Sequence, residues 1–249
     1  PPPQGFTIPT FSLDSGLAIE REAAELKGFF GRDMLLTMEP RAYYLFTPYQ
    51  SQAQTPLFDT ADAGFGVSQI YSDNTFVGND RIADSNAATL GLTSRMIEAN
   101  TGAERANVTL AQKQQFTAQK VGLNGNIANP TTYSDTLGSA SVRLLGNLSA
   151  DMFGQYNTQL NKFVQTTVGA SWRPTQGRSL NFGYRNVWSP PTQPFGPTPG
   201  TLAQTTTDQY NVSGQWPITR EVSVLGRWGY DALSTKTLNT LVALEWARD

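Results

Sequence analysis

The 249-residue chain carries 18 Lys and Arg residues against 20 Asp and Glu residues, so its charge gives no sign of a nucleic-acid-binding surface. It contains no Cys and no His, which excludes thiol nucleophiles, His-based catalytic triads and most zinc sites within this chain. Charged residues make up 15% of the chain, below the roughly 25% of a typical soluble domain, and Gly, Asn, Gln, Ser and Thr take their place. This composition suits a sheet with one apolar and one polar face.

Neither an export signal nor a membrane helix is expected in this chain. The first residues, 1–5 (PPPQG), have no basic region and no apolar region of the kind found in a leader. No stretch approaches the roughly 18 consecutive apolar residues of a transmembrane helix. If the chain meets a membrane, it must cross the bilayer with strands.

A two-residue period predicts about eleven strands along the chain. They are expected, in chain order, at 12–22, 32–46, 86–97, 104–117, 139–146, 148–157, 161–173, 178–187, 205–217, 220–231 and 235–248. The pattern is clearest in the C-terminal half, where Val164, Val168 and Trp172 alternate with Gln165 and Ser171. Residues of the two kinds therefore point to opposite faces of a sheet.

The lengths of strands and loops indicate the class of sheet. Many predicted strands contain ten or more residues, whereas soluble sheets usually have five or six and a tilted membrane strand needs about 9–11. The long connections, 47–85, 118–138 and 188–204, all follow even-numbered strands, as expected when long loops lie on one side of a membrane. We therefore predict an all-β fold, a segment of a transmembrane antiparallel β-barrel. An odd number of strands with unpaired edges predicts that this segment is part of a larger barrel.

Aromatic residues are expected at both ends of the strands. The amphipathic rings of Trp and Tyr favour the headgroup region of a bilayer, so we predict a membrane girdle. Its members would be Trp172, Trp216 and Trp246 at the turn end, and Tyr44, Trp188, Trp228 and Tyr230 at the loop end. The alternative interpretation places these rings in the core of a soluble β-sandwich.

Five segments resemble, in order and approximate spacing, sequences of the LptD family of outer-membrane lipopolysaccharide translocons. They are 37–49 (TMEPRAYYLFTPY), 76–86 (FVGNDRIADSN), 93–95 (TSR), 181–185 (NFGYR) and 214–218 (GQWPI). The resemblance implies that residues 1–249 form part of the C-terminal barrel domain, with the family's periplasmic domain and barrel-closing strands outside this chain. The complete barrel would have roughly two dozen strands.

The resemblance also implies partners. The barrel would enclose a plug lipoprotein similar to LptE, receive lipopolysaccharide from a periplasmic bridge of Lpt components, and release it into the outer leaflet of the bacterial outer membrane. No cofactor is implied. Carboxylates have no matched acid–base partner at a recognisable spacing and Ser has no His base, so no catalytic residue and no enzymatic activity are expected.

Several charged residues are candidate sites on the polar face. Glu39 and Arg41 are two apart on one strand and must avoid lipid, because an Arg at the bilayer centre costs about 2–4 kcal/mol. Pro40 between them cannot donate to a ladder, so a bulge or a break in pairing is expected there. Asp80 and Arg81 are expected to fold inward and anchor their loop.

Scattered basic residues form a second group of candidates. They could line the lumen and meet lipid phosphates, although basic residues also serve any polar pore. This group is Arg95, Arg105, Lys113, Arg143, Arg185 and Arg227. For the pairs Glu39–Arg41 and Asp80–Arg81, a structural role is favoured over contact with substrate.

Two further hypotheses follow from the same pattern. A general porin, or another large outer-membrane transporter, would show the same alternation, but would have no reason to carry the 80–82 motif beside the strand of Glu39 and Arg41. A soluble β-rich adhesin domain belongs to a different class. It would be recovered in buffer, whereas a barrel requires detergent.

Overall fold

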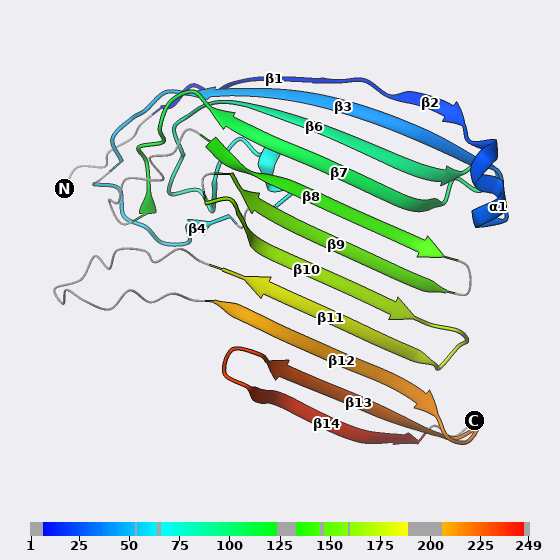
Figure 1. Ribbon diagram of the computed structural model, residues 1–249. Coiled ribbons are helices and arrows are strands. Elements are labelled where there is room, and N and C mark those ends of the chain that lie inside the picture. Colours follow the sequence, from blue (N-terminus) through cyan, green and yellow to red (C-terminus); the bar gives the residue numbers. More distant parts are fainter. Residues whose placement is uncertain are drawn as a thin grey trace. The chain divides into compact units, whose positions relative to one another are not determined.

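The computed structural model describes residues 7–52, 54–63, 66–123, 133–144, 147–158, 160–188 and 206–246. Nearly all regular structure in these ranges is β-strand (Figure 1). The strands are β1 (Phe11–Gly16), β2 (Ile19–Glu22), β3 (Met34–Thr47), β4 (Ala61–Asp62), β5 (Phe76–Val77), β6 (Ser85–Glu98), β7 (Glu104–Gln115), β8 (Tyr133–Leu144), β9 (Leu148–Asn157), β10 (Lys162–Trp172), β11 (Ser179–Val187), β12 (Thr207–Pro217), β13 (Val222–Asp231) and β14 (Lys236–Trp246). The helical elements are η1 (Ala24–Leu26), α1 (Lys27–Phe30) and η2 (Gln69–Tyr71), and none of these described helices is long and apolar enough to span a bilayer.

The predicted all-β fold is confirmed. Twelve of the described strands form one sheet in the order β1-β3-β6-β7-β8-β9-β10-β11-β12-β13-β14, with β2 beside β3. From β6 onward each strand has 9–14 residues, which agrees with the long strands expected from the sequence. Strands that follow one another along the chain are neighbours in this part of the sheet, so the sequence order of the hairpins is also their spatial order.

Two of the predicted strands differ clearly from the structure, whereas the bounds of the others agree to within a few residues. The strand β8 begins at Tyr133, six residues before the predicted start at 139. The sequence pattern missed these residues because Ser134, Asp135 and Gly138 are of types that also favour turns. The single strand predicted at 12–22 is divided into β1 and β2. The predicted stiff loop at 190–199 lies outside the described residues.

Pro40 explains the division of the first strand. The β1–β3 ladder ends at the pair Gly16–Arg41, and the next residue, Leu17, donates its N–H to the Pro40 carbonyl at 3.1 Å. In an antiparallel ladder two such residues exchange both hydrogen bonds, and Pro40 has no N–H to return. Pairing is therefore interrupted at Leu17 and resumes in β2, and the break in pairing predicted at Pro40 is confirmed.

The chain divides into two compact units. Unit 1 contains residues 1–20, 37–94 and 109–138, and unit 2 contains 21–36, 95–108 and 139–249. In unit 2, antiparallel ladders join β9 through β14, and Figure 1 shows these strands side by side as a series of hairpins. Its buried apolar cluster, Ala23, Phe30 and Met34, is small and lies around α1.

Unit 1 differs because its loops fold back against its strands. The long connection after β3 contains the two-stranded sheet β4–β5 and the helical turn η2, none of which the alternating pattern predicted. A second apolar cluster forms there from Phe76, Ala83 and Val121. The loops of unit 1 therefore have a packed structure of their own.

Candidate functional site

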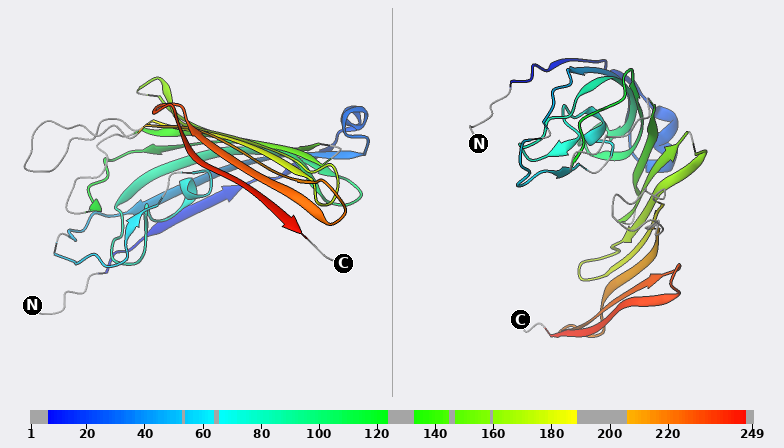
Figure 2. Two further views of the ribbon diagram at one scale, coloured as in Figure 1. Left: turned by 90° about the horizontal axis from the view of Figure 1, so that it is seen from below. Right: turned by 90° about the vertical axis from the view of Figure 1, so that its left-hand side faces the viewer.

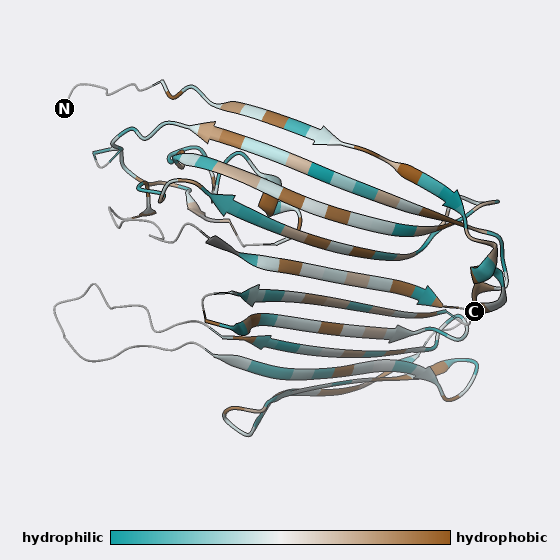
Figure 3. Ribbon diagram, turned by 45° about the horizontal axis from the view of Figure 1, so that its top comes forward, coloured by the Kyte–Doolittle hydropathy of each residue, from teal (hydrophilic) through white to brown (hydrophobic). Residues whose placement is uncertain are grey.

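One face of the sheet in unit 2 is apolar and exposed. The ladders place Phe182 opposite Val212 and Val212 opposite Trp228, so apolar side chains form rows across three strands. The exposed fractions of Met152, Val212 and Leu244 are 54%, 42% and 72%. Figure 3 shows the resulting alternation of hydrophobic and hydrophilic bands along the strands. A contiguous apolar surface of this kind marks an interface with lipid or with another protein.

The opposite face of the same strands is polar. Ser149 lies opposite Ser171, and Ser171 lies opposite Asn181. The Ser171 hydroxyl donates to Asn181 Oδ1 at 2.8 Å, and Asn181 Nδ2 reaches the Ser213 hydroxyl at 3.5 Å. Small hydroxyl and amide side chains thus continue across β9 to β12 on this face, leaving space above the sheet near its turn end.

Three aromatic residues lie at the turn end of unit 2. Trp172, Trp216 and Trp246 each stand at or next to the last residue of their strand, as expected from the sequence. The rings of Trp172 and Trp216 are 6.2 Å apart, and Trp246 Nε1 donates to Glu221 Oε2 at 3.2 Å. These residues combine exposed ring surface with polar neighbours, which is the environment an interfacial Trp requires.

Aromatic residues also lie at the loop end. The rings of Trp228 and Tyr230 stack 5.4 Å apart at the end of β13, and Lys162 Nζ lies 3.3 Å from the centre of the Trp188 ring. In unit 1 the Tyr44 hydroxyl donates to Asn86 Oδ1 at 3.0 Å. The seven residues predicted for the girdle thus lie within three residues of a strand end in the two units.

In unit 1 the loop around η2 covers one face of β3 and β6, which we call the inner face. Tyr43 and Leu45 are buried on this face, while Phe46 on the other face is 42% exposed. The Tyr43 hydroxyl donates to Asp73 of the loop, and Thr89 Oγ1 donates to the Ile70 carbonyl at 3.2 Å. The inner face of these strands is therefore occupied by the chain's own loop.

Arg41 connects this loop with the edge strand. Its guanidinium donates to both carboxylate oxygens of Asp14 on β1, with Nε–Oδ1 at 2.9 Å and Nη2–Oδ2 at 2.5 Å. The same guanidinium lies 4.2 Å from the centre of the Tyr71 ring. Glu39 instead accepts a hydrogen bond from Thr37 at 2.9 Å. The structure therefore brings Arg41 together with Asp14 and Tyr71, which the sequence pattern did not identify.

Asp80 and Arg81 tie the loop to itself. Asp80 Oδ2 accepts the backbone N–H groups of Phe58 at 2.7 Å and Asp59 at 2.9 Å, and these two bonds hold the pKa of the carboxyl below its usual value. Arg81 is 4% exposed and donates to the carbonyls of Gln52 and Thr55. Both side chains therefore close a turn of about 25 residues by charge-assisted hydrogen bonds.

Arg95 and Arg105 each take part in ion pairs within unit 2. Arg95 Nε lies 3.6 Å from Glu104 Oε2. The buried carboxylate of Glu98 pairs with Arg32 at 2.6 Å and with Arg105 at 3.2 Å. In the part of the chain that the structure describes, no cluster of Asp and Glu side chains could hold a metal ion.

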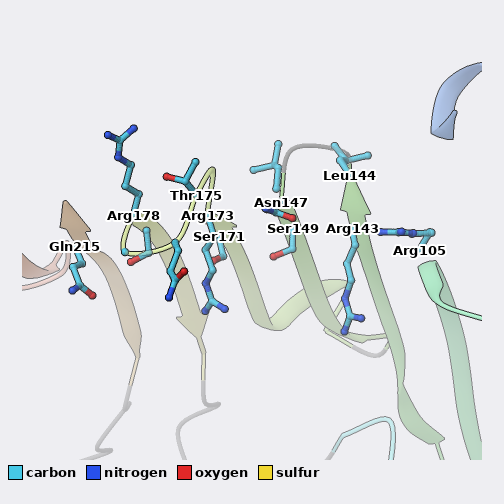
Figure 4. Close-up of a pocket in the computed structure, with 14 residues that line it drawn as sticks. Arg105, Arg143, Leu144, Asn147, Ser149, Ser171, Arg173, Thr175, Arg178 and Gln215 are labelled. Atoms are coloured by element: carbon cyan, nitrogen blue, oxygen red, sulfur yellow. The ribbon is translucent and has the colours of Figure 1, made fainter. Parts of the chain in front are cut away.

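A basic groove of about 860 Å³ lies at the turn end of the polar face of unit 2 (Figure 4). Its floor contains Ser149, Ser171 and Ser179, and four arginines line it: Arg105, Arg143, Arg173 and Arg178. None of the described residues that line it is acidic. Figure 4 shows Arg143 and Arg173 extending in the same direction, whereas Arg178 points the opposite way.

Two of these arginines were missed by the sequence interpretation. Arg173 and Arg178 flank the β10–β11 turn, outside the alternating strand pattern that selected Arg105 and Arg143. Arg178 lies 5.1 Å from the centre of the Trp216 ring, so its charge is directed toward the aromatic side. The two-residue period could have identified Arg173, because it lies two residues after Ser171 and continues the same polar row beyond the end of β10.

Comparison with known proteins places the chain in one family. Residues 3–228 match the family described as LptD, LPS transport system D. The LPS-assembly protein LptD of Cupriavidus pinatubonensis is 39% identical over 244 residues, which is 98% of this chain and 29% of the relative. That of Burkholderia cenocepacia is 41% identical over 255 residues, 99% of this chain and 30% of the relative. The chain thus spans less than a third of the length of these relatives. With the match covering most of its residues, the chain belongs to the LptD family.

Proposed function

We propose that this chain is a segment of the outer-membrane β-barrel through which lipopolysaccharide is inserted into the outer leaflet. The observation that carries the proposal is the two-faced sheet, whose exposed apolar rows lie on the reverse of continuous polar rows. Strands of 9–14 residues are long enough to cross a bilayer when tilted. Membership of the LptD family supports lipopolysaccharide as the substrate.

In this proposal the apolar face meets lipid. Val242 and Leu244 near the end of the sheet are 75% and 72% exposed, and a contiguous row of such side chains favours contact with hydrocarbon or with another apolar surface. The Trp and Tyr residues at the strand ends form the girdle at the two headgroup regions. Trp172 and Trp216 belong to the turn side, and Trp228 and Tyr230 belong to the loop side.

The polar face would then line the lumen. Its Ser, Asn and Gln side chains suit a path for the hydrophilic sugar portion of lipopolysaccharide, because they exchange hydrogen bonds with hydroxyl groups. Asp80, Arg81 and Arg41 have a structural role in this account: Asp80 and Arg81 hold the loop of unit 1 together, and Arg41 joins that loop to the edge strand β1. Glu39 and Arg95 are proposed to stabilise the lumenal surface by local hydrogen bonding and ion pairing.

The partners follow from the family. We infer a plug lipoprotein similar to LptE inside the barrel, and a periplasmic bridge of Lpt components that delivers lipopolysaccharide. The barrel itself would make and break no covalent bond, since its work is transport with energy supplied elsewhere. These partners would act on the complete barrel, of which this chain supplies part of the wall.

A photo-crosslinking experiment tests this function. A photoreactive residue is placed at Asn211 on the polar face, and in a second variant at Val212 on the apolar face of the same strand. We expect lipopolysaccharide adducts at position 211 only while transport is supplied with energy, whereas adducts at 212 do not depend on it. A conducting channel with no lipopolysaccharide adduct at 211 would favour a porin and overturn the proposal.

A further inference from the structure

We propose that the basic groove of unit 2 binds phosphate monoester groups at the turn end of the polar face. The inference deepens the proposed function and rests on it for the source of the phosphate, which would be a phosphorylated lipid headgroup. The groove is defined by Arg105, Arg143 and Arg173 and by the three serines that line it with them (Figure 4). Its chemistry also fits free inorganic phosphate, and the test below separates the two sources.

The position of the arginines follows from the period of the strands. Arg105 belongs to the same row of β7 as the buried Thr109 and Ala111, and Arg173 continues the row of Gln165 and Ser171 on β10. Arg143 belongs to the row of buried Leu137 on β8. Because side chains two residues apart share a face, all three guanidinium groups arise from the polar face.

Their spacing suits more than one phosphate oxygen. β8 and β10 are separated by β9 alone, so the backbones that carry Arg143 and Arg173 lie about 10 Å apart. Arginine side chains can converge across that distance on one anionic group or bind two groups side by side. Each guanidinium can donate two parallel hydrogen bonds to phosphate oxygens.

The charge of the groove is not neutralised locally. Within the described residues, neither Arg143 nor Arg173 has a carboxylate at ion-pair distance, while Arg105 shares Glu98 with Arg32. The floor adds hydroxyl donors from Ser149, Ser171 and Ser179 instead of acceptors with negative charge. An exposed pair of unneutralised arginines above short hydroxyl side chains is a site for an anion with several oxygens.

The choice of variants follows from these contacts. Arg105→Gln is unsuitable, because it would leave the buried carboxylate of Glu98 with one partner fewer. The double variant Arg143→Gln and Arg173→Gln removes two exposed charges and breaks no ion pair that the structure describes. Arg220→Gln with Lys236→Gln is the charge-matched control, because both residues are exposed in unit 2 and lie outside the groove.

Binding is measured with the full-length protein purified in detergent. The probes are inorganic phosphate, lipopolysaccharide, and the same lipopolysaccharide after enzymatic removal of its phosphates. We expect the groove variant to bind intact lipopolysaccharide roughly tenfold more weakly than the wild type, the effect of losing one or more charged hydrogen bonds. Dephosphorylated lipopolysaccharide should bind equally weakly to wild type and groove variant, and the control variant should retain wild-type affinity.

The other possible outcomes of this experiment also support or overturn the proposed site. Loss of phosphate binding with unchanged lipopolysaccharide affinity would support the groove as an anion site that takes free phosphate. Equal weakening in the groove and control variants would show a general effect of charge and overturn the site, as would equal affinity of all three proteins for both inorganic phosphate and lipopolysaccharide. Failure of the groove would leave the energy-dependent adducts at position 211 of the wild type unchanged, so it is distinguishable from failure of the proposed function.

Discussion

The hydroxyl oxygen of Tyr71 occupies the space that a side chain at position 91 would need. A Cβ built on Gly91 would lie 1.8 Å from that oxygen and 3.1 Å from the adjacent ring carbon. Gly91 thus permits the loop around η2 to approach β6 closely. Tyr71 also contacts Tyr43, with ring centres 6.3 Å apart, and carries the guanidinium of Arg41 over its ring. One aromatic side chain therefore joins the loop to two strands of unit 1.

The variant Gly91→Ala should loosen this attachment. The stiff Tyr71 side chain must move away, which costs about 1–3 kcal/mol of packing energy. We expect faster proteolysis within 66–84, with the sheet still folded. Gly226→Ala is the matched control, because a Cβ at that strand position meets no atom within 4 Å. Equal protease sensitivity of Gly91→Ala and wild type would contradict the role assigned to Tyr71.

Arg81→Gln should destabilise the loop of unit 1. The buried guanidinium satisfies the carbonyls of Gln52 and Thr55, and a shorter neutral side chain leaves at least one of them without a donor. Loss of charge-assisted hydrogen bonds in a buried place costs about 1.5–3 kcal/mol. Hydrogen exchange of the peptide covering 50–60 reports the change. Arg220→Gln, at an exposed turn, is the control and should leave exchange in that peptide unchanged.

Acidification should release the same loop through Asp80. Its pKa lies below the ordinary value of 3.8, because the backbone N–H groups of Asp59 and Phe58 stabilise the carboxylate. The stabilisation is therefore complete above about pH 4 and is lost as the pH falls through the lower folded-state pKa. Amide exchange at 58–59, corrected for intrinsic rates, should rise only below that range. Asp80→Asn removes the titrating group, so its corrected exchange should show no such rise. A rise already between pH 7 and pH 5 in the wild type would contradict this assignment.

Charge on the two faces of β12 should have opposite consequences. Val212→Arg places a guanidinium among the exposed apolar rows, at a cost of about 2–4 kcal/mol if that face meets the centre of a bilayer. Ser213→Arg, one residue along the same strand, enters the polar face and should be tolerated. Folding into lipid vesicles, followed by the heat-dependent shift in gel mobility, measures both. Equal folding yields of the two variants would argue against a lipid-facing apolar surface.

The alternation of side chains was sufficient to predict most strands, because every residue of a long, two-faced strand reports its face. Val212 and Asn211 are examples: each was assigned to the correct face from its neighbours in sequence alone. The strands β4 and β5 were not predictable, since two residues are too few to show a period. The start of β8 was concealed by residues that also favour turns.

The candidate sites depended more on contacts distant in sequence. Arg41 was a candidate from the sequence, but its partner Asp14 lies 27 residues away, and only the β1–β3 register brings the two together. The residues next to Tyr71 in the sequence give no indication that its ring contacts Arg41. Arg173 is a candidate because it lines the same groove as Arg143, which lies two strands away in the sheet. Such relations are set by strand register and loop packing.

The contact of the apolar face with lipid is tested most directly by spin labels on β12 in lipid vesicles. Single labels at Asn211, Val212 and Ser213 are compared for their accessibility to oxygen, which concentrates in hydrocarbon, and to a water-soluble nickel complex. We predict that the label at 212 is reached mainly by oxygen and that the labels at 211 and 213 are reached mainly by nickel. A label at 212 shielded from both reagents, beside nickel-accessible labels at 211 and 213, would place Val212 in a protein interior and contradict the account.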